Sequence, residues 1–296
     1  MKAKTVVVLT CLGLAQSALA NIDIQFDYSY DTSHFFTGSN AYRQDVLNAA
    51  AATFESRLTD SLGAITSTSN NHFTASFFNP ADPNSSYVQL PDQSVATDVI
   101  RIYVGGYDFG AGTLGIGGPG GFSCSGLGNF CASATSRGQG KTNNPGATDV
   151  APWGGAISFD TSTNWNFTMA APTIGQYDLY SVAVHELGHV LGFGTSDSFT
   201  DHLSGLTFSG ATTGSVAMYD SAHWAQNITS KVNGIAQEPA MTPFLEDGQR
   251  KYFTDLDFAA LHDIGWQVSA VPEPEAWAML LAGLGLIGWA ARRRRR

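Results

Sequence analysis

The chain has 296 residues, of which 43% are hydrophobic and 14% are charged, and its formal net charge at pH 7 is −10. Seven Lys and Arg residues and two Glu residues lie within 1–20 and 269–296, so the body of the chain, 21–268, carries −15. Nucleic-acid binding needs a basic surface, and this acidic body therefore excludes nucleic acid as the expected partner. The length allows one large domain or two small ones.

Residues 1–20 predict a secretory signal peptide. Two lysines precede an apolar run from Thr5 to Leu14 that is too short to span a membrane, and Ala18-Leu19-Ala20 is typical of a cleavage site. The mature chain would begin at Asn21, and the alternative is an uncleaved N-terminal anchor.

Three segments of the N-terminal half show a clear pattern. Ile22 to Tyr28 alternates apolar and polar side chains, which predicts a strand. Arg43 to Leu62 repeats its apolar residues at helical spacing, and Gly63 supplies a stop signal. Val99 to Val104 predicts a second strand, so the order strand, helix, strand suggests a right-handed crossover onto one sheet.

The stretch from Gly105 to Gly128 is very rich in glycine, and we expect it to be a surface loop over the sheet. It lacks the Gly-Lys-Ser/Thr ending of a phosphate-binding loop. Cys124 and Cys131 are the only cysteines of the mature body, and in an oxidising compartment they should form a disulfide. The chain-entropy model gives such a short loop roughly 2–3 kcal/mol of stabilisation. The alternative is that one thiolate masks a metal in a latent form.

After a polar stretch from Ser133 to Ala151, Trp153 to Asp160 predicts another short strand. Asp178 is a good N-cap for a helix that continues to Val190. Gly192 should end that helix, because glycine tolerates the left-handed conformation found after a helix.

This helix contains His185-Glu186-Leu187-Gly188-His189, a His-Glu-x-x-His motif. Residues four apart lie on one face of a helix, so His185 and His189 can hold one Zn²⁺ together. Glu186 points about 100° away from His185 around the helix, which suits it to bind a metal-bound water as general base rather than to ligate.

A catalytic zinc needs a third protein ligand and one open position. In the metzincin pattern a histidine follows the glycine by three residues, but here that position holds Thr195. The downstream candidates are Asp197, Asp201, His202 and His223. The borderline softness of zinc favours imidazole over carboxylate where either can reach.

His223-Trp224, followed by Met241 among turn-forming residues, resembles the leishmanolysin branch of the metzincin proteases. The resemblance implies that His223 is the third ligand, that Met241 supports the metal site from below, and that the insertion 193–222 is a surface excursion. It also implies an α+β fold. We expect an α/β-like N-terminal subdomain with a twisted mixed sheet, a long zinc helix and a mostly irregular or helical C-terminal subdomain. No long linker interrupts the chain, so one metalloprotease domain over 21–268 is expected.

Two further segments resemble metzincins. The order of the strand ending at Asp160 and the segment Tyr177–Ala183 is similar to that of matrixins, but no matrixin calcium site is expected, because Thr161-Ser162-Thr163 replaces the acidic residues. Tyr252 to Leu261 resembles the metzincin C-terminal helix, with Thr254 or Asp255 as its cap.

The C-terminal segment 269–296 contains Val271-Pro272-Glu273-Pro274, an apolar run from Ala276 to Ala291 and five arginines. It resembles the PEP-CTERM sorting signal of Gram-negative bacteria. The resemblance implies transient anchoring in the inner membrane by a short transmembrane run, removal of the tail by an exosortase, and delivery to the cell surface or exopolysaccharide matrix. The alternative is a plain C-terminal anchor, although the run is marginal in length for a stable span.

These patterns predict a secreted zinc endopeptidase acting on protein or peptide substrates. We expect the substrate to pair with Trp153–Phe159 as an added strand. Phe244 stands where some metzincins have an oxyanion-stabilising tyrosine, so no residue is assigned that role. The alternative is a non-catalytic matrix or adhesion protein with a structural zinc site, which would need a fourth ligand.

Overall fold

The computed structural model describes residues 22–110 and 112–269. The predicted signal peptide and the C-terminal apolar run lie outside these residues. Within the described ranges, no helix combines the length and the apolar character needed to cross a membrane.

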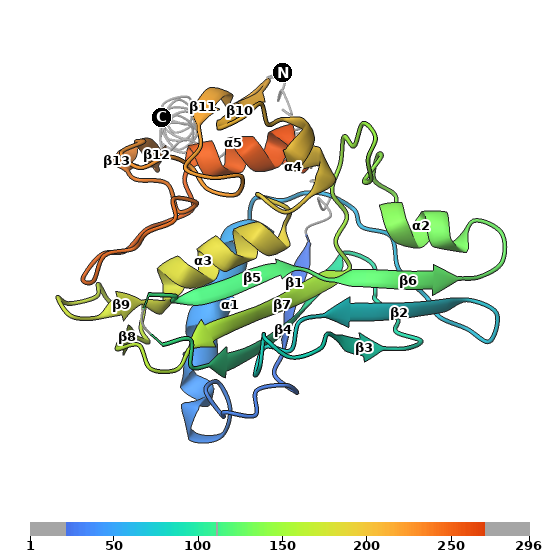
Figure 1. The fold of residues 1–296 in the computed structure, drawn as a ribbon, viewed down its shortest axis with the longest axis horizontal. Helices are drawn as coiled ribbons and strands as arrows, with labels where there is room; N and C mark the ends of the chain where they lie inside the picture. Colours follow the sequence, from blue (N-terminus) through green and yellow to red (C-terminus); the bar gives the residue numbers. More distant parts are fainter. Residues whose placement is uncertain (1–21, 111, 270–296) are drawn as a thin grey trace, which may run out of the picture.

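A four-stranded mixed sheet forms the centre of the fold (Figure 1). Its strands, in spatial order, are β1 (Asp23–Asp27), β4 (Val99–Tyr107), β7 (Gly154–Asp160) and β5 (Gly115–Pro119). The first three are parallel, and β5 runs antiparallel to β7. Every residue of β7 is buried, as expected of an inner strand covered on both faces. The predicted α+β fold with a twisted mixed sheet is confirmed.

Two helices pack against each other and against this sheet: α1 (Gln44–Glu55), which follows the 3₁₀ helix η1 (Gly38–Arg43), and α3 (Leu179–Val190). The helix predicted to reach Leu62 instead ends at Glu55. Beyond it, Leu58 forms an isolated bridge with Val268, and Thr59 donates its backbone N–H to Gln267 O. Pairing with the distant C-terminal segment therefore overrides the helical pattern.

The prediction of a surface loop over Gly105–Gly128 is wrong. The segment contains the end of β4, all of β5 and the strand β6 (Gly121–Ser125). Glycine lets β5 lie against α3 without side chains between them: a Cβ on Gly117 would lie 2.8 Å from the Cβ of Glu186. The glycines of β5 therefore allow close packing of the strand on the helix and do not indicate a flexible loop.

Beside the main sheet lies a three-stranded antiparallel sheet of β3 (Val88–Leu90), β2 (His72–Phe77) and β6. The two sheets share an aromatic cluster. In this cluster Phe77 stacks on Tyr103, at 4.1 Å between ring centroids, and Phe73 contacts Trp153. A disulfide between Cys124 and Cys131 joins β6 to α2 (Phe130–Ser136).

The remaining elements are short. These are the parallel pair β8 (Trp165–Asn166) and β9 (Tyr177–Asp178), helix α4 (Asp197–Asp201), the hairpins β10 (Thr207–Gly210)–β11 (Gly214–Ala217) and β12 (Ser230–Val232)–β13 (Ile235–Gln237), and helix α5 (Asp255–Asp263). Thr254 caps α5 through a capping box with Asp257, which decides between the two predicted caps.

The insertion 193–222 is not a surface excursion throughout, which corrects the prediction. Phe193, Phe199 and Phe208 are completely or almost completely buried and belong to the main core. Phe193 and Phe208 both pack edge-on against the buried Trp224, at 5.0 and 5.6 Å between centroids. The insertion therefore builds the region around His223.

Candidate metal centre and active site

Helix α3 places two histidines on one face. Asp178 begins the helix by accepting a hydrogen bond from Ser181 N, and Gly192 follows its end with φ +102°. Both predicted boundaries are confirmed. His185 and His189 are one turn apart, and their Nε2 atoms lie 3.1 Å from each other.

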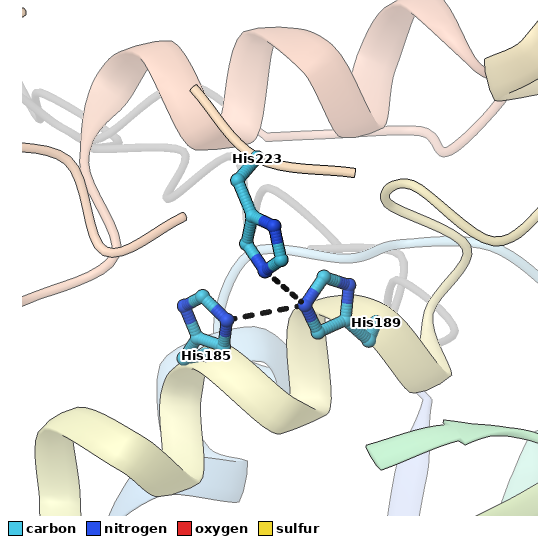
Figure 2. Close-up of side chains that lie close together, drawn as sticks. All are labelled: His185, His189 and His223. Atoms are coloured by element: carbon cyan, nitrogen blue, oxygen red, sulfur yellow. Dashed lines mark hydrogen bonds between the residues drawn. The ribbon is translucent and has the colours of Figure 1, made fainter. Parts of the chain in front are cut away.

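His223 reaches the same point from the loop after β11 (Figure 2). Its Nε2 lies 3.2 Å from His189 Nε2, and its ring lies nearly parallel to that of His185, at 5.2 Å between centroids. One nitrogen from each of the three rings falls within 4.8 Å of the others. Among the residues described, this is the only such group of three potential ligands.

The opposite nitrogen of each ring has an acceptor. Nδ1 of His185 lies 2.7 Å from Ala240 O, Nδ1 of His189 lies 2.8 Å from Phe193 O, and Nδ1 of His223 lies 2.9 Å from both carboxylate oxygens of Asp220. Oxygens of this kind only accept, so each Nδ1 carries a proton, and in the neutral ring the lone pair then lies on Nε2. Three lone pairs facing one point fit a cation, and three imidazoles fit Zn²⁺.

Burial keeps the two helix histidines neutral. It lowers the pKa of His185 well below the ordinary value, with a further contribution from the neighbouring His189. Burial also lowers the pKa of His189 to about 4, opposed by its hydrogen bond to Phe193 O. Neutral imidazole is the form that binds a metal, so both side chains are ready to ligate at neutral pH.

Glu186 lies in the cleft but outside the group of three histidines. Burial raises its pKa to about 8, and the backbone amide of Gly117 on β5 offsets part of the rise. A cation bound next to the carboxyl would favour its charged form and lower this pKa.

The other candidates for a third ligand lie outside the histidine group. The ring nitrogens of His202 face Ser209 O and Asp263 O, at 2.8 and 2.9 Å. Asp197 accepts a hydrogen bond from Asn144 N, and neither it nor Asp201 belongs to the histidine group.

Met241 packs against α3 at Gly188, beside the two histidines. It is fully buried, and a Cβ on Gly188 would come within 2.6 Å of its sulfur, so helix and methionine are in close contact. The segments that carry Trp224 and Met241 are joined by Asp257, whose carboxylate accepts from Trp224 Nε1 at 2.9 Å and from Ala240 N at 3.0 Å. Burial raises the pKa of Asp257 to about 6.

Two supporting residues, Asp220 and Asp257, were missed in the sequence. Asp257 occupies the third position of a capping box, a pattern that marks a helix start but not its contacts with other segments. Asp220 lies three residues before His223, a spacing that would have identified it only once His223 was accepted as a ligand.

A cleft of about 960 Å³ opens in front of the three histidines. One wall is the start of β5 with its glycines, and the other is the segment after Met241; the lining includes Gly115, Gly117, Thr242, Phe244, Leu245 and Lys251. The Lys251 ammonium, which is almost fully buried, fixes the second wall by donating to Thr242 Oγ1 at 2.7 Å and pairing with Glu238 at 2.8 Å.

The strand predicted to bind substrate, Trp153–Phe159, is the wrong one. Its strand β7 lies between β4 and β5, so both of its edges are already paired. The last strand of the sheet on this side is β5, which also lines the cleft.

Comparison with known families agrees with this geometry. Residues 135–204 match the family model described as matrixin, which includes His185, Glu186 and His189 but ends before His223. Residues 270–296 match the PEP-CTERM protein-sorting motif. No significant match was found among curated proteins or among solved structures.

Both matches support the corresponding sequence resemblances. The matrixin match supports a zinc metalloprotease in general. The PEP-CTERM motif indicates a secreted protein whose C-terminal tail is processed by an exosortase.

Proposed function

We propose that the protein is a secreted zinc-dependent endopeptidase, in which His185, His189 and His223 hold the metal and Glu186 is the general base. The observation that carries this proposal is the convergence of three Nε2 atoms in an open cleft, each on a ring whose Nδ1 faces an oxygen acceptor, with a buried carboxyl in the same cleft. A structural zinc is normally enclosed by four protein ligands. Three ligands and an open cleft favour catalysis.

A zinc ion held by these residues supplies Lewis acidity toward the scissile carbonyl and a more acidic bound water. Glu186 accepts the proton of the attacking water and returns it to the leaving amine. Because the Glu186 carboxyl is buried beside β5, bulk water is kept from the transferred proton. The backbone carbonyls that accept from Nδ1 of His185 and His189 fix both rings, so that their Nε2 atoms would face the metal.

The substrate would lie extended along the free edge of β5, as an added strand in front of the histidines. The glycines of β5 allow a peptide backbone to approach this edge closely, and side chains of the substrate would point toward the wall formed by Thr242, Phe244 and Leu245.

The rest of the chain would deliver the enzyme. We propose residues 1–20 as a cleaved signal peptide, 21–268 as one metalloprotease domain, and 269–296 as the sorting segment that an exosortase removes. The enzyme would then act at the cell surface or in the exopolysaccharide matrix.

The test compares the purified wild-type protein with Glu186→Ala for zinc content and casein digestion. Wild type should bind one zinc and digest casein, whereas the variant should keep its zinc and lose activity by about 10²–10⁴-fold, the usual contribution of general acid–base catalysis. Equal activity in the two proteins would contradict the role of Glu186. Zinc binding by wild type without cleavage of any protein substrate would instead favour a matrix or adhesion protein with structural zinc.

A further inference from the structure

The three proposed ligands are not supported in the same way. His185 and His189 both direct Nδ1 at a neutral backbone carbonyl, whereas His223 directs Nδ1 at a carboxylate. The helix also fixes the first two relative to each other, because they are one turn apart on α3. His223 comes from a loop and needs another means of orientation.

The loop itself provides that means through Asp220. Both carboxylate oxygens lie 2.9 Å from His223 Nδ1, and Oδ1 also accepts from Ala222 N at 2.8 Å. Tyr219 N donates to His223 O at 2.9 Å and closes the turn. The carboxylate is thus held on one side by the backbone and on the other by the imidazole.

The neighbouring residue fixes the backbone but not the ring. Trp224 is buried, its N–H donates to Met241 O at 2.9 Å, and its indole donates to Asp257. These contacts hold the chain beside His223, but the rotation of the imidazole still depends on what its Nδ1 bonds. Asp220 is the partner found there.

We propose that Asp220 is a positioning residue for the metal centre: it fixes the tautomer and direction of His223 and, through its charge, makes this imidazole a stronger donor to zinc. The proposal rests on the proposed function, in which His223 is a zinc ligand. A carboxylate hydrogen-bonded to a ligating histidine raises the basicity of the ligand, and loss of such a partner typically weakens metal binding by about 10–100-fold.

The experiment measures zinc affinity of the full chain by competition with a chelator of known affinity, and the rate of zinc loss to excess EDTA. The variants are Asp220→Ala, which removes the acceptor, and Asp220→Asn, which keeps an acceptor oxygen but removes the charge. Asp92→Ala is the matched control, because Asp92 forms the same kind of pair with His72 Nδ1, at 2.6 Å, outside the metal site.

We expect Asp220→Ala to weaken zinc binding by about 10–100-fold and to lose zinc faster, with Asp220→Asn intermediate. Asp92→Ala should have the zinc affinity and the rate of zinc loss of the wild type. Thermal unfolding of the metal-free proteins shows whether each variant folds. If Asp220→Ala does not fold, the zinc affinity of Asp220→Asn tests the proposal. Wild-type affinity in both Asp220 variants would overturn the proposal, while absence of zinc from the wild-type protein would overturn the proposed function itself.

Discussion

The position of His223 depends on the fold around α3, whereas the positions of the other two histidines depend on the motif within the helix. The motif supplies two imidazoles whose relative position is fixed by the helix. The third imidazole lies 34 residues beyond His189 and is brought back by the buried aromatic side chains of the intervening insertion. A ligand at this distance depends on packing as well as on chemistry.

Replacing His223 by Ala should therefore abolish stoichiometric zinc binding, because two imidazoles remain where three are needed. His202→Ala is the control. The His202 ring is hydrogen-bonded to two backbone carbonyls outside the proposed metal centre, so this variant should keep its zinc. Metal content after gel filtration measures both. Full zinc content in His223→Ala would transfer the role of third ligand to Asp197 or Asp201.

The contact between β5 and α3 sets the geometry of the cleft. A Cβ on Gly117 would lie 2.8 Å from both Cβ and O of Glu186, closer than real Cβ atoms approach. The adjacent Gly118 has nothing within 4 Å of the same position. Two neighbouring glycines of one strand thus have different roles.

Gly117→Ala should push β5 away from α3, with a cost of about 1–3 kcal/mol in unfolding free energy, as is usual for overpacking. It should also lower kcat, because the displaced strand no longer holds the Glu186 carboxylate in place. Gly118→Ala should cost much less unfolding free energy, because its added Cβ would meet no atom within 4 Å. Urea unfolding gives the unfolding free energy of each variant, and peptide hydrolysis gives its kcat. Equal unfolding free energies in the two variants would contradict this role of the strand.

The C-terminal end of the described chain is joined to the segment that follows α1, by residues that do not line the cleft. Thr59 donates to Gln267 O, and Gln267 N donates to both carboxylate oxygens of Asp60, at 3.0 and 3.1 Å. The segment that leads into the sorting signal is therefore anchored to the chain that follows α1. Burial raises the pKa of Asp60 to about 6, and the nearby Asp149 adds to the rise.

This raised pKa predicts a pH dependence of stability. The ordinary pKa of Asp is 3.8, so between about pH 4 and pH 6 the folded protein binds more protons at Asp60 than the unfolded chain does. The unfolding free energy should therefore fall as pH rises through this window, by at most about 3 kcal/mol from this group. In Asp60→Asn the fall should be smaller by the contribution of Asp60, while the buried Asp257, whose pKa is also raised to about 6, still contributes its own. Urea unfolding at several pH values measures it, and parallel curves for the two proteins would refute the prediction.

Much of the site was readable from the sequence because its signals are local. The His-Glu-x-x-His spacing depends only on helical periodicity, and the caps Asp178, Gly192 and Thr254 act within a few residues of each helix end. The choice of His223 needed only the chemistry of zinc and a resemblance in motif order, and the structure brings this residue to the other two.

Only the tertiary structure decided which strand borders the cleft, where α1 ends and how the insertion packs. The glycine-rich segment has no apolar alternation, so nothing in it predicts that β5 pairs with β7 and packs on α3. The residues after Glu55 keep a helical pattern, yet Leu58 pairs with Val268. In each case the partner is distant along the chain, and the free energy comes from pairing and burial that a local pattern does not contain.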